Sequence, residues 1–290
     1  MVWRRNVLLA EREGNVKLVH HCVICNSSNV TKKLGLFTPF MSHRMFEYPL
    51  IQVSDGSGVR FLDVFTNAIW CDDCGAVFSQ MRPDADELAR VYEGYRGPDY
   101  NAIRTIFEPN YPMMNAAIDS DAEWKNRQNL SCDFLEDKVN PATIHRILDY
   151  GGDKGQYIPR IFSGSEKFVY DISGVGVEDG VQIVNDLAAV GQVDFVMASN
   201  ILEHVSYPQE ILADILKVCR PGAFIFIDVP QENPAVTPVL DFHEHINFFT
   251  PATVRRLIEC MGLSLLKMSL AKIDQGGSKN QSIYALAQVG

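Results

Sequence analysis

The amino-acid sequence predicts an α/β protein: a doubly wound, mostly parallel seven-stranded sheet with a small N-terminal metal-binding module. Three observations lead to this prediction. From Ile144 onward, short apolar runs alternate with helical patterns, as in parallel strands joined by crossover helices. A turn rich in glycine follows the first of these runs. Two Cys-x-x-Cys pairs stand near the start of the chain.

The two pairs, Cys22 with Cys25 and Cys71 with Cys74, are separated by residues 26–70. Each pair can hold one side of an ion, and four thiolates brought together form the tetrahedral site that structural Zn²⁺ prefers. Disulfides are disfavoured in a reducing compartment, and redox pairs are a poor fit because no βαβ pattern surrounds them. His43 is an alternative ligand within the intervening loop. We therefore expect a zinc-binding module over residues 1–82, in which metal replaces a large apolar core.

A helical connector is expected over residues 83–140. Acidic residues in the first turn and apolar residues at helical spacing predict a helix over residues 83–92. A longer amphipathic helix is expected over residues 113–137. Aromatic residues crowd between the two, and they either pack the connector or line the mouth of a pocket. They are Tyr92, Tyr95, Tyr100, Phe107 and Tyr111.

The remaining residues, 141–290, form the predicted main domain. Its expected strands are residues 145–150, 167–171, 182–184, 193–199, 223–229, 263–270 and 281–288. The segment before the last strand is too short for a crossover helix, so this strand is expected to pair antiparallel.

The glycine turn lies in the stretch from Ile147 to Tyr157 and follows a strand that ends in Asp149. Glycines let a ligand approach the backbone, and the free N–H groups at a helix start favour electron-rich ligand atoms. The dinucleotide fingerprint does not fit, because Asp153 and Gln156 occupy the positions where glycines are required. A phosphate-binding P-loop does not fit either, because no Gly-Lys-Ser/Thr closes the turn.

Ligands of a doubly wound sheet bind at the carboxyl ends of its strands, where this sequence places polar residues. Asp171 ends the second strand and can accept hydrogen bonds from both hydroxyls of a ribose. Asp186 and Leu187 follow the third strand, where a polar and an apolar group can meet an adenine. The run that starts at Asn200 and includes His204 follows the fourth.

A His-Glu-His sequence, residues 243–245, follows the fifth strand and leads into a helix start at Thr250-Pro251. Its histidines are candidate metal ligands, but the flanking aromatic residues favour a substrate-side loop. A histidine that titrates near neutrality can act as a general base. We assign this role to His245, orientation or substrate hydroxyl binding to Glu244, and a second polar contact to His204.

Over residues of about 144 to 288, this set resembles the class I S-adenosylmethionine-dependent methyltransferases. The matching features are the glycine turn after an acid and the run Asn-Ile-Leu-Glu-His-Val after the fourth strand. The resemblance implies S-adenosylmethionine as cofactor, a Rossmann-like fold, and contacts to the methionine portion, the ribose and the adenine. The residues it assigns to the cofactor are Asp149, Gly151, Gly152, Gly155, Asp171, Asp186, Leu187 and Asn200.

With the Cys pairs, the aromatic connector and the His-Glu-His loop, the chain also resembles deoxysugar C-methyltransferases that act on nucleotide-linked keto sugars. That resemblance implies proton abstraction by Glu244 and His245. Phe242 stands where that family has a tyrosine, and the resemblance does not extend to the C-terminal domain of those enzymes. Methylation of a sugar or other small molecule at oxygen remains an alternative.

Net charge and composition limit the partners. The net charge of −10 and the lack of a dense basic cluster disfavour nucleic acid as a substrate. No apolar run has the length of a membrane span, and Glu11-Arg12-Glu13 interrupts the apolar start, so we expect a cytoplasmic protein. The expected partner is a small-molecule acceptor, with a homo-oligomer possible in principle. The alternatives are a zinc-ribbon RNA methyltransferase and a non-catalytic binding protein with this fold.

Overall fold

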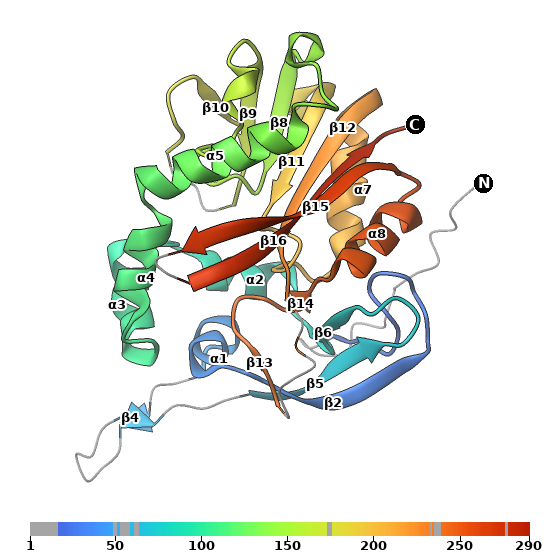
Figure 1. Cartoon of the computed structure of the whole chain (residues 1–290). Coiled ribbons are helices and arrows are strands. Elements are labelled where there is room, and N and C mark those ends of the chain that lie inside the picture. The colour runs from blue at the N-terminus through green and yellow to red at the C-terminus, as the bar shows by residue number, and fades with distance from the viewer. Residues whose placement is uncertain are drawn as a thin grey trace.

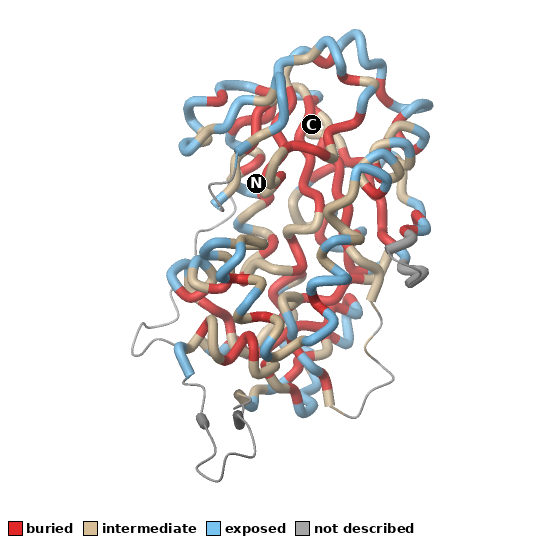
Figure 2. The backbone as a smooth tube through the Cα atoms, turned by 90° about the vertical axis from the view of Figure 1, so that its left-hand side faces the viewer, coloured by how far each residue is buried: buried red, intermediate tan, exposed pale blue. Residues whose placement is uncertain are grey.

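The computed structural model (Figure 1) describes residues 17–48, 51–52, 59–60, 64–172, 176–232, 234, 239–275 and 278–290. Two sheets dominate these residues. Buried positions lie in the interior of the chain (Figure 2) and are densest along the central strands of the larger sheet. None of the described helices is long and apolar enough to cross a membrane.

The main sheet has seven strands in the order β10-β9-β8-β11-β12-β16-β15. The strands are β8 (Arg146–Tyr150), β9 (Glu166–Tyr170), β10 (Val181–Ile183), β11 (Val193–Ser199), β12 (Cys219–Pro230), β15 (Ser264–Gln275) and β16 (Ser278–Gln288). The first five are parallel, and β16 pairs antiparallel with both β12 and β15. The predicted strands, including the antiparallel last strand, are therefore confirmed.

Helices cover both faces of this sheet. On one face, α7 (Pro208–Val218) and α8 (Pro251–Cys260) pack through Leu212, Ile215 and Leu257. On the other face, Phe134 and Leu135 of α5 (Asp121–Leu135) join a second core with Phe162 of the short helix η2 (Arg160–Phe162). The short helix η1 (Pro141–Thr143), which follows α5, is exposed. Two faces with separate apolar cores are the expected result of strands that are buried on both sides.

The N-terminal part contains a five-stranded sheet in the order β13-β2-β5-β6-β14. Three strands come from the expected zinc module: β2 (Val30–Phe37), β5 (Val64–Cys71) and β6 (Val77–Ser79). The two edge strands, β13 (Leu240–Phe242) and β14 (Asn247–Phe248), come from the main domain. Smaller pairs are β1 (Lys17–Leu18) with β7 (Met81–Arg82), and β3 (Ile51–Gln52) with β4 (Val59–Arg60). The expected boundary at residue 82 therefore does not separate two independent sheets.

The connector consists of α2 (Ala85–Tyr92), α3 (Pro98–Phe107) and α4 (Tyr111–Ile118), which lead into α5. Asp84 and Glu87 form a reciprocal capping box at the start of α2, as the acidic first turn indicates. The prediction of a single helix over residues 113–137 is wrong, because the helix is interrupted between α4 and α5. Ser120 accepts the backbone N–H of Glu123 and so starts α5 as a new helix.

One buried arginine joins the N-terminal part to the main domain. The Arg82 side chain is fully buried, and its Nε donates to the carbonyl of Ser206 at 2.8 Å. Its Nη2 donates to the carbonyl of Val205 at 3.0 Å and to Oδ1 of Asn247 at 2.7 Å. Nη1 donates to the carbonyl of Ser79 at 3.1 Å. The guanidinium therefore binds a loop after β11 and the start of β14 at the same time.

Replacing Arg82 with Met removes these donors, and the carbonyl oxygen of Ser206 and Oδ1 of Asn247 lose the donor that Arg82 supplies. We expect Arg82→Met to lower the free energy of unfolding by about 3 kcal/mol, because each orphaned buried acceptor costs about 1–3 kcal/mol. Chemical denaturation measures the difference, with Arg255→Met as a control at an exposed arginine. Equal stability of the two variants would show that the Arg82 contacts are dispensable.

Candidate active site

A cavity of about 910 Å³ opens at the carboxyl ends of the central strands. On one side it is lined by the glycine turn after β8 and by Ser199 and Asn200 after β11. On the other side it is lined by Glu203 and His204, by Gln231 and Glu232 after β12, and by Glu244 and His245. The cavity therefore lies where ligand binding was expected from the sequence, at the carboxyl ends of the strands.

The glycine positions of the turn have no room for a side chain. Gly151 and Gly155 have φ values of +72° and +76°, which side-chain-bearing residues rarely adopt. A Cβ on Gly151 would collide with Ile201, and a Cβ on Gly152 would collide with the carboxyl group of Asp149. The turn can therefore pack against Asp149 and Ile201 only because these positions have no side chain.

Asp149 lies beneath this turn and is 1% exposed. Neither of its carboxylate oxygens has a hydrogen-bond partner among the described residues. Burial, together with the nearby Asp171 and Asp153, raises the pKa of Asp149 to about 7. A buried carboxyl group with two open oxygens at the cavity wall is suited to a ligand that brings its own N–H or O–H donors.

Some of the cofactor residues assigned from the sequence line the cavity and others do not. Asp171 follows β9, and its Oδ2 accepts the backbone N–H of Asp153 in the glycine turn at 2.9 Å. Asp186 caps the four-residue helix α6 (Leu187–Val190) by accepting the N–H of Ala188. Gly155, Asp171, Asp186 and Leu187 do not line the cavity, whereas Asp149, Gly151, Gly152 and Asn200 do.

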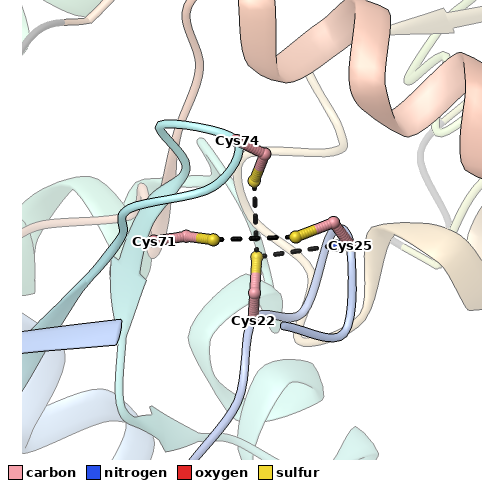
Figure 3. A group of neighbouring side chains, drawn as sticks. All are labelled: Cys22, Cys25, Cys71 and Cys74. Carbon is pink, nitrogen blue, oxygen red and sulfur yellow. Dashed lines mark hydrogen bonds between the residues drawn. The ribbon is translucent and has the colours of Figure 1, made fainter. Parts of the chain in front are cut away.

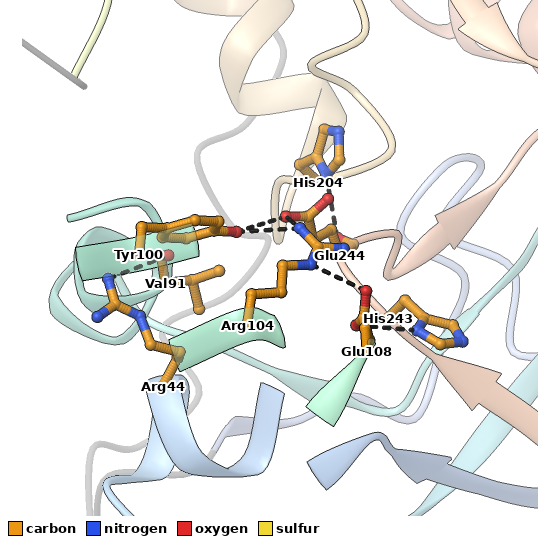
Figure 4. Close-up of polar contacts among 8 residues, drawn as sticks. All are labelled: Arg44, Val91, Tyr100, Arg104, Glu108, His204, His243 and Glu244. Carbon is orange, nitrogen blue, oxygen red and sulfur yellow. Dashed lines mark hydrogen bonds and ion pairs between the residues drawn. The ribbon is translucent and has the colours of Figure 1, made fainter. Parts of the chain in front are cut away.

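Glu244 is held by the connector helix α3 (Figure 4). Its Oε1 accepts from Arg104 Nη1 at 2.5 Å and from the Tyr100 hydroxyl at 2.8 Å. Burial favours the neutral acid, but Arg104, His204 and the Tyr100 hydrogen bond outweigh it, so the pKa of Glu244 is lowered. Glu244 is therefore an ionised, well-oriented acceptor, and its partners Arg104 and Tyr100 were not identified from the sequence.

His204 and His245 pack against each other, with ring centroids 4.8 Å apart. Nδ1 of His204 lies 3.0 Å from the carbonyl oxygen of Glu244, so it must carry the proton. Nδ1 of His245 lies 3.0 Å from Oε1 of Glu232. Burial lowers the pKa of His204 to about 4, with a contribution from His245. Burial acts the same way on His245, but pairing with Glu232 outweighs it and raises the pKa of His245 to about 9.

Glu203 and Glu232 were not chosen from the sequence as site residues. Glu203 stands within the run Asn-Ile-Leu-Glu-His-Val after the fourth strand, and Glu232 lies just after β12. Their positions at strand ends could have marked both as candidate site residues. His243 differs from its neighbours: its side chain is 57% exposed and lies 3.9 Å from Glu108. Among described residues, His245 groups with Glu203 and His204 rather than with His243, so a His243–His245 metal pair is not supported.

The aromatic residues of the connector have both roles considered from the sequence: they pack the connector and they line the cavity. Tyr100 and Tyr111 are buried in the core of the N-terminal part, and Phe40 packs edge-on to Tyr100 at 5.5 Å. Tyr95 and Tyr111 also line the cavity, together with Arg96 and Met114. The connector therefore forms one wall of the site.

The four cysteines of the two pairs come together as expected (Figure 3). Sγ of Cys22 lies 3.6 Å from Sγ of Cys74, and Sγ of Cys25 lies 3.6 Å from Sγ of Cys71. Tetrahedral Zn²⁺ with bonds of about 2.3 Å requires sulfurs about 3.8 Å apart, so the donor set fits zinc. His43 is not part of this group, since its Nδ1 contacts the carbonyl of Tyr48 at 2.7 Å.

The His-Glu-His loop spans the N-terminal sheet, because its two ends are the edge strands β13 and β14. The N–H of Thr38 donates to the carbonyl of Phe242 at 3.1 Å, and the N–H of Ser79 donates to that of Ile246 at 2.9 Å. Phe242 is fully buried, and a Cβ on Gly35 would contact its ring at 2.8 Å. Glu244 and His245 are thus positioned by the module that carries the cysteines.

Comparisons with known proteins agree with this geometry. A family model described as a methyltransferase domain matches residues 120–268, just over half of the chain. The ubiquinone biosynthesis O-methyltransferase of Aeromonas salmonicida (strain A449) is 27% identical over 172 residues, which cover 47% of this chain and 70% of that protein.

Two solved structures align with lower similarity. The 1,6-didemethyltoxoflavin-N1-methyltransferase of Burkholderia thailandensis, with S-adenosylhomocysteine bound, is 14% identical; the match covers 75% of this chain and 97% of that chain, with a TM-score of 0.46. The N-methyltransferase NodS of Bradyrhizobium japonicum WM9 is 11% identical; the match covers 59% and 98%, with a TM-score of 0.41.

The family match covers the glycine turn, the strand ends that line the cavity and the His-Glu-His loop. The chain therefore belongs to the methyltransferase domain family and is an S-adenosylmethionine-dependent methyltransferase.

Proposed function

We propose that the enzyme methylates a small polar acceptor, a sugar or a nucleotide-linked sugar, at oxygen or carbon. The observation that carries the proposal is one cavity that holds both the glycine turn and the cluster of His204, Glu244 and His245. Arg96 and Lys272 add positive groups to the same cavity. Charged and hydroxyl-binding groups on several walls suit an acceptor rich in oxygen. The name of the Aeromonas relative supports oxygen as the methylated atom.

For the cofactor, we propose the assignment expected from the sequence. The open carboxyl group of Asp149 and the turn of Gly151, Gly152 and Gly155 would hold the methionine portion of S-adenosylmethionine. Asp171 would bind the ribose, with Asp186 and Leu187 near the adenine and Asn200 as a further contact to the cofactor. The contact between Asp171 and the backbone of the glycine turn supports one continuous binding surface for these groups.

Methyl transfer from a sulfonium is an in-line displacement, so the protein must place the acceptor and accept its proton when the nucleophile is neutral. Glu244 would orient an acceptor hydroxyl, and His204 would supply a second polar contact. His245 is the base assigned from the sequence. Its ring accepts a proton only when neutral, and pairing with Glu232 keeps it charged below about pH 9.

We also propose that Cys22, Cys25, Cys71 and Cys74 bind structural Zn²⁺. Two Sγ–Sγ distances of 3.6 Å, with all four sulfurs within 4.8 Å of one another, support this proposal. The turns that carry the cysteines are closed by backbone hydrogen bonds from Asn26 to Cys22 and from Gly75 to Cys71, both 2.9 Å. Zinc would stabilise a region, residues 1–82, whose sheet positions the His-Glu-His loop. The connector, residues 83–140, and the domain over residues 141–290 would supply the remaining walls of the site.

Release of S-adenosylhomocysteine tests the acceptor class directly. We expect release with at least one member of a panel of nucleotide-linked keto and hydroxy sugars, and none with RNA oligonucleotides, because the net charge is −10. Omitting the sugar is the control for cofactor hydrolysis. Activity on RNA alone would replace the sugar proposal with the zinc-ribbon RNA methyltransferase.

Calorimetric titration with S-adenosylhomocysteine tests the ribose assignment. We expect Asp171→Ala to weaken binding by about 1–3 kcal/mol, or roughly 5- to 150-fold, because two ribose hydroxyls lose their acceptor. Asp171→Asn keeps one acceptor oxygen and should lose less. Asp179→Ala, at an exposed aspartate nearby, is the control. Unchanged affinity in both Asp171 variants would rule out this residue as the ribose ligand.

Zinc loss should affect the acceptor side more than the cofactor side. Elemental analysis of the purified chain should find about one Zn²⁺, which Cys25→Ser should lose, with a drop in melting temperature of at least about 5 °C. Cofactor affinity should change little, because the glycine turn lies on the other sheet. Cys132→Ser, at a half-buried thiol outside the group, is the control. Full zinc content in Cys25→Ser would contradict the site.

A further inference from the structure

Glu203 is the most unusual side chain of the cavity. It is 1% exposed, it lines the cavity, and neither carboxylate oxygen has a hydrogen-bond partner among the described residues. A buried carboxylate without partners is costly unless a proton or a ligand completes it. The carboxyl group of Glu203 is therefore open to an interaction that the described residues do not provide.

The position of Glu203 is fixed by its backbone. Its carbonyl oxygen accepts the N–H of Ile246 at 2.8 Å and that of Asn247 at 3.1 Å. The Asn247 side chain donates in turn to the carbonyls of Leu202 and Val205, at 2.8 and 2.7 Å. Glu203 is thus attached directly to the His-Glu-His loop, and its side chain is held beside His245.

The other basic groups of the cluster are already engaged. Nδ1 of His245 is paired with Glu232, and Oε1 of Glu244 accepts from both Arg104 and Tyr100. Nδ1 of His204 must carry a proton because it faces a carbonyl oxygen. Nε2 of His204 lies 3.7 Å from Oε1 of Glu203. His204 is a weak base, because burial lowers its pKa to about 4. Among the described residues, Glu203 is the carboxyl group of this cluster whose two oxygens accept no hydrogen bond.

We propose that Glu203, rather than His245, takes the proton of the methyl acceptor. This inference rests on the proposed function and deepens it. The acceptor's O–H or C–H bond breaks as its proton moves to a carboxylate oxygen of Glu203. The electron pair left on the acceptor attacks the methyl carbon, the carbon–sulfur bond breaks, and its electrons remain on sulfur. S-adenosylhomocysteine, the methylated acceptor and neutral Glu203 result, and Glu203 then releases the proton to solvent.

In this arrangement, the charged ring of His245 acts as a hydrogen-bond donor to the acceptor oxygen. Ligand atoms of Glu203, His204 and His245 lie within 4.8 Å of one another, so one acceptor group can contact all three. A positive donor next to the oxygen stabilises negative charge that develops there as the proton leaves. The cluster thus combines a proton acceptor and an electrostatic stabiliser around one atom.

The electrostatic environment supports the same role. Burial raises the pKa of Glu203 to about 8, an effect that His245 partly offsets and that Asp228 and Glu232 reinforce. Tyr92 on α2 also faces this carboxyl group, and His204 follows it in the chain. A base must be ionised to act and the His245 donor must stay charged, so turnover should rise with pH through about 8 and fall again above about 9.

Infrared titration examines Glu203 without any acceptor. We expect a carboxylic-acid carbonyl band that disappears with a midpoint near pH 8 in the full chain, that Glu203→Gln lacks, and that the exposed control Glu210→Gln keeps. A Glu203 that is fully ionised at pH 6 would overturn the proposal. This measurement remains informative even if every sugar fails as an acceptor, an outcome that would reject the proposed function instead.

Turnover with an active acceptor gives the second test. Glu203→Gln should lower kcat at least about 100-fold, remove the rise near pH 8 and leave cofactor affinity unchanged. Added acetate should partly restore turnover to Glu203→Ala, which a structural role would not allow. His245→Gln should keep the rise but move it to higher pH, because the charge of His245 lowers the pKa of Glu203. The proposal fails if His245→Gln loses that rise while Glu203→Gln keeps it. It also fails if wild-type turnover requires added Mn²⁺ or Mg²⁺, because Glu203, His204 and His245 would then be cation ligands.

Discussion

The architecture of the site depends on the buried guanidinium of Arg82. No carboxylate neutralises it among the described hydrogen bonds; carbonyl oxygens and the Asn247 amide surround it instead. These acceptors come from the N-terminal sheet, the loop after β11 and the start of β14. Planar donors in a fixed fork can hold three segments in one geometry, which a flexible ammonium cannot do as well. The loops that carry Glu203 and His245 are therefore positioned by a contact outside the cavity.

A second constraint is that two strands from the main domain complete the N-terminal sheet. After β12 the chain leaves the main sheet, adds β13 and β14 to the two edges of the N-terminal sheet, and returns to the main domain at α8. The N-terminal sheet fixes the loop, and the loop presents Glu244 and His245 to the cavity. The part of the chain that carries the cysteine group therefore positions residues of the candidate site.

Charge pairing divides the cavity into engaged and open groups. Arg104 with Glu244, and Arg127 with Glu123, are buried ion pairs whose members satisfy each other. Asp149 and Glu203 are buried acids with open oxygens. The first lies at the glycine turn and the second beside the histidines, so each half of the cavity keeps one acid for a ligand. The paired groups set the geometry, and the open ones remain available for binding and proton transfer.

The sequence by itself determined the main sheet, its antiparallel last strand, the glycine turn and the cysteine pairs, because hydrophobic periodicity, glycine and Cys-x-x-Cys spacing are local properties of the chain. It did not determine the break at Ser120, where a cap competes with helical periodicity. Only the tertiary structure decided that β13 and β14 complete the N-terminal sheet, that Glu232 charges His245, and that Glu203 is left open. Each of these depends on segments distant in sequence that meet in space, and on desolvation, which no single segment specifies.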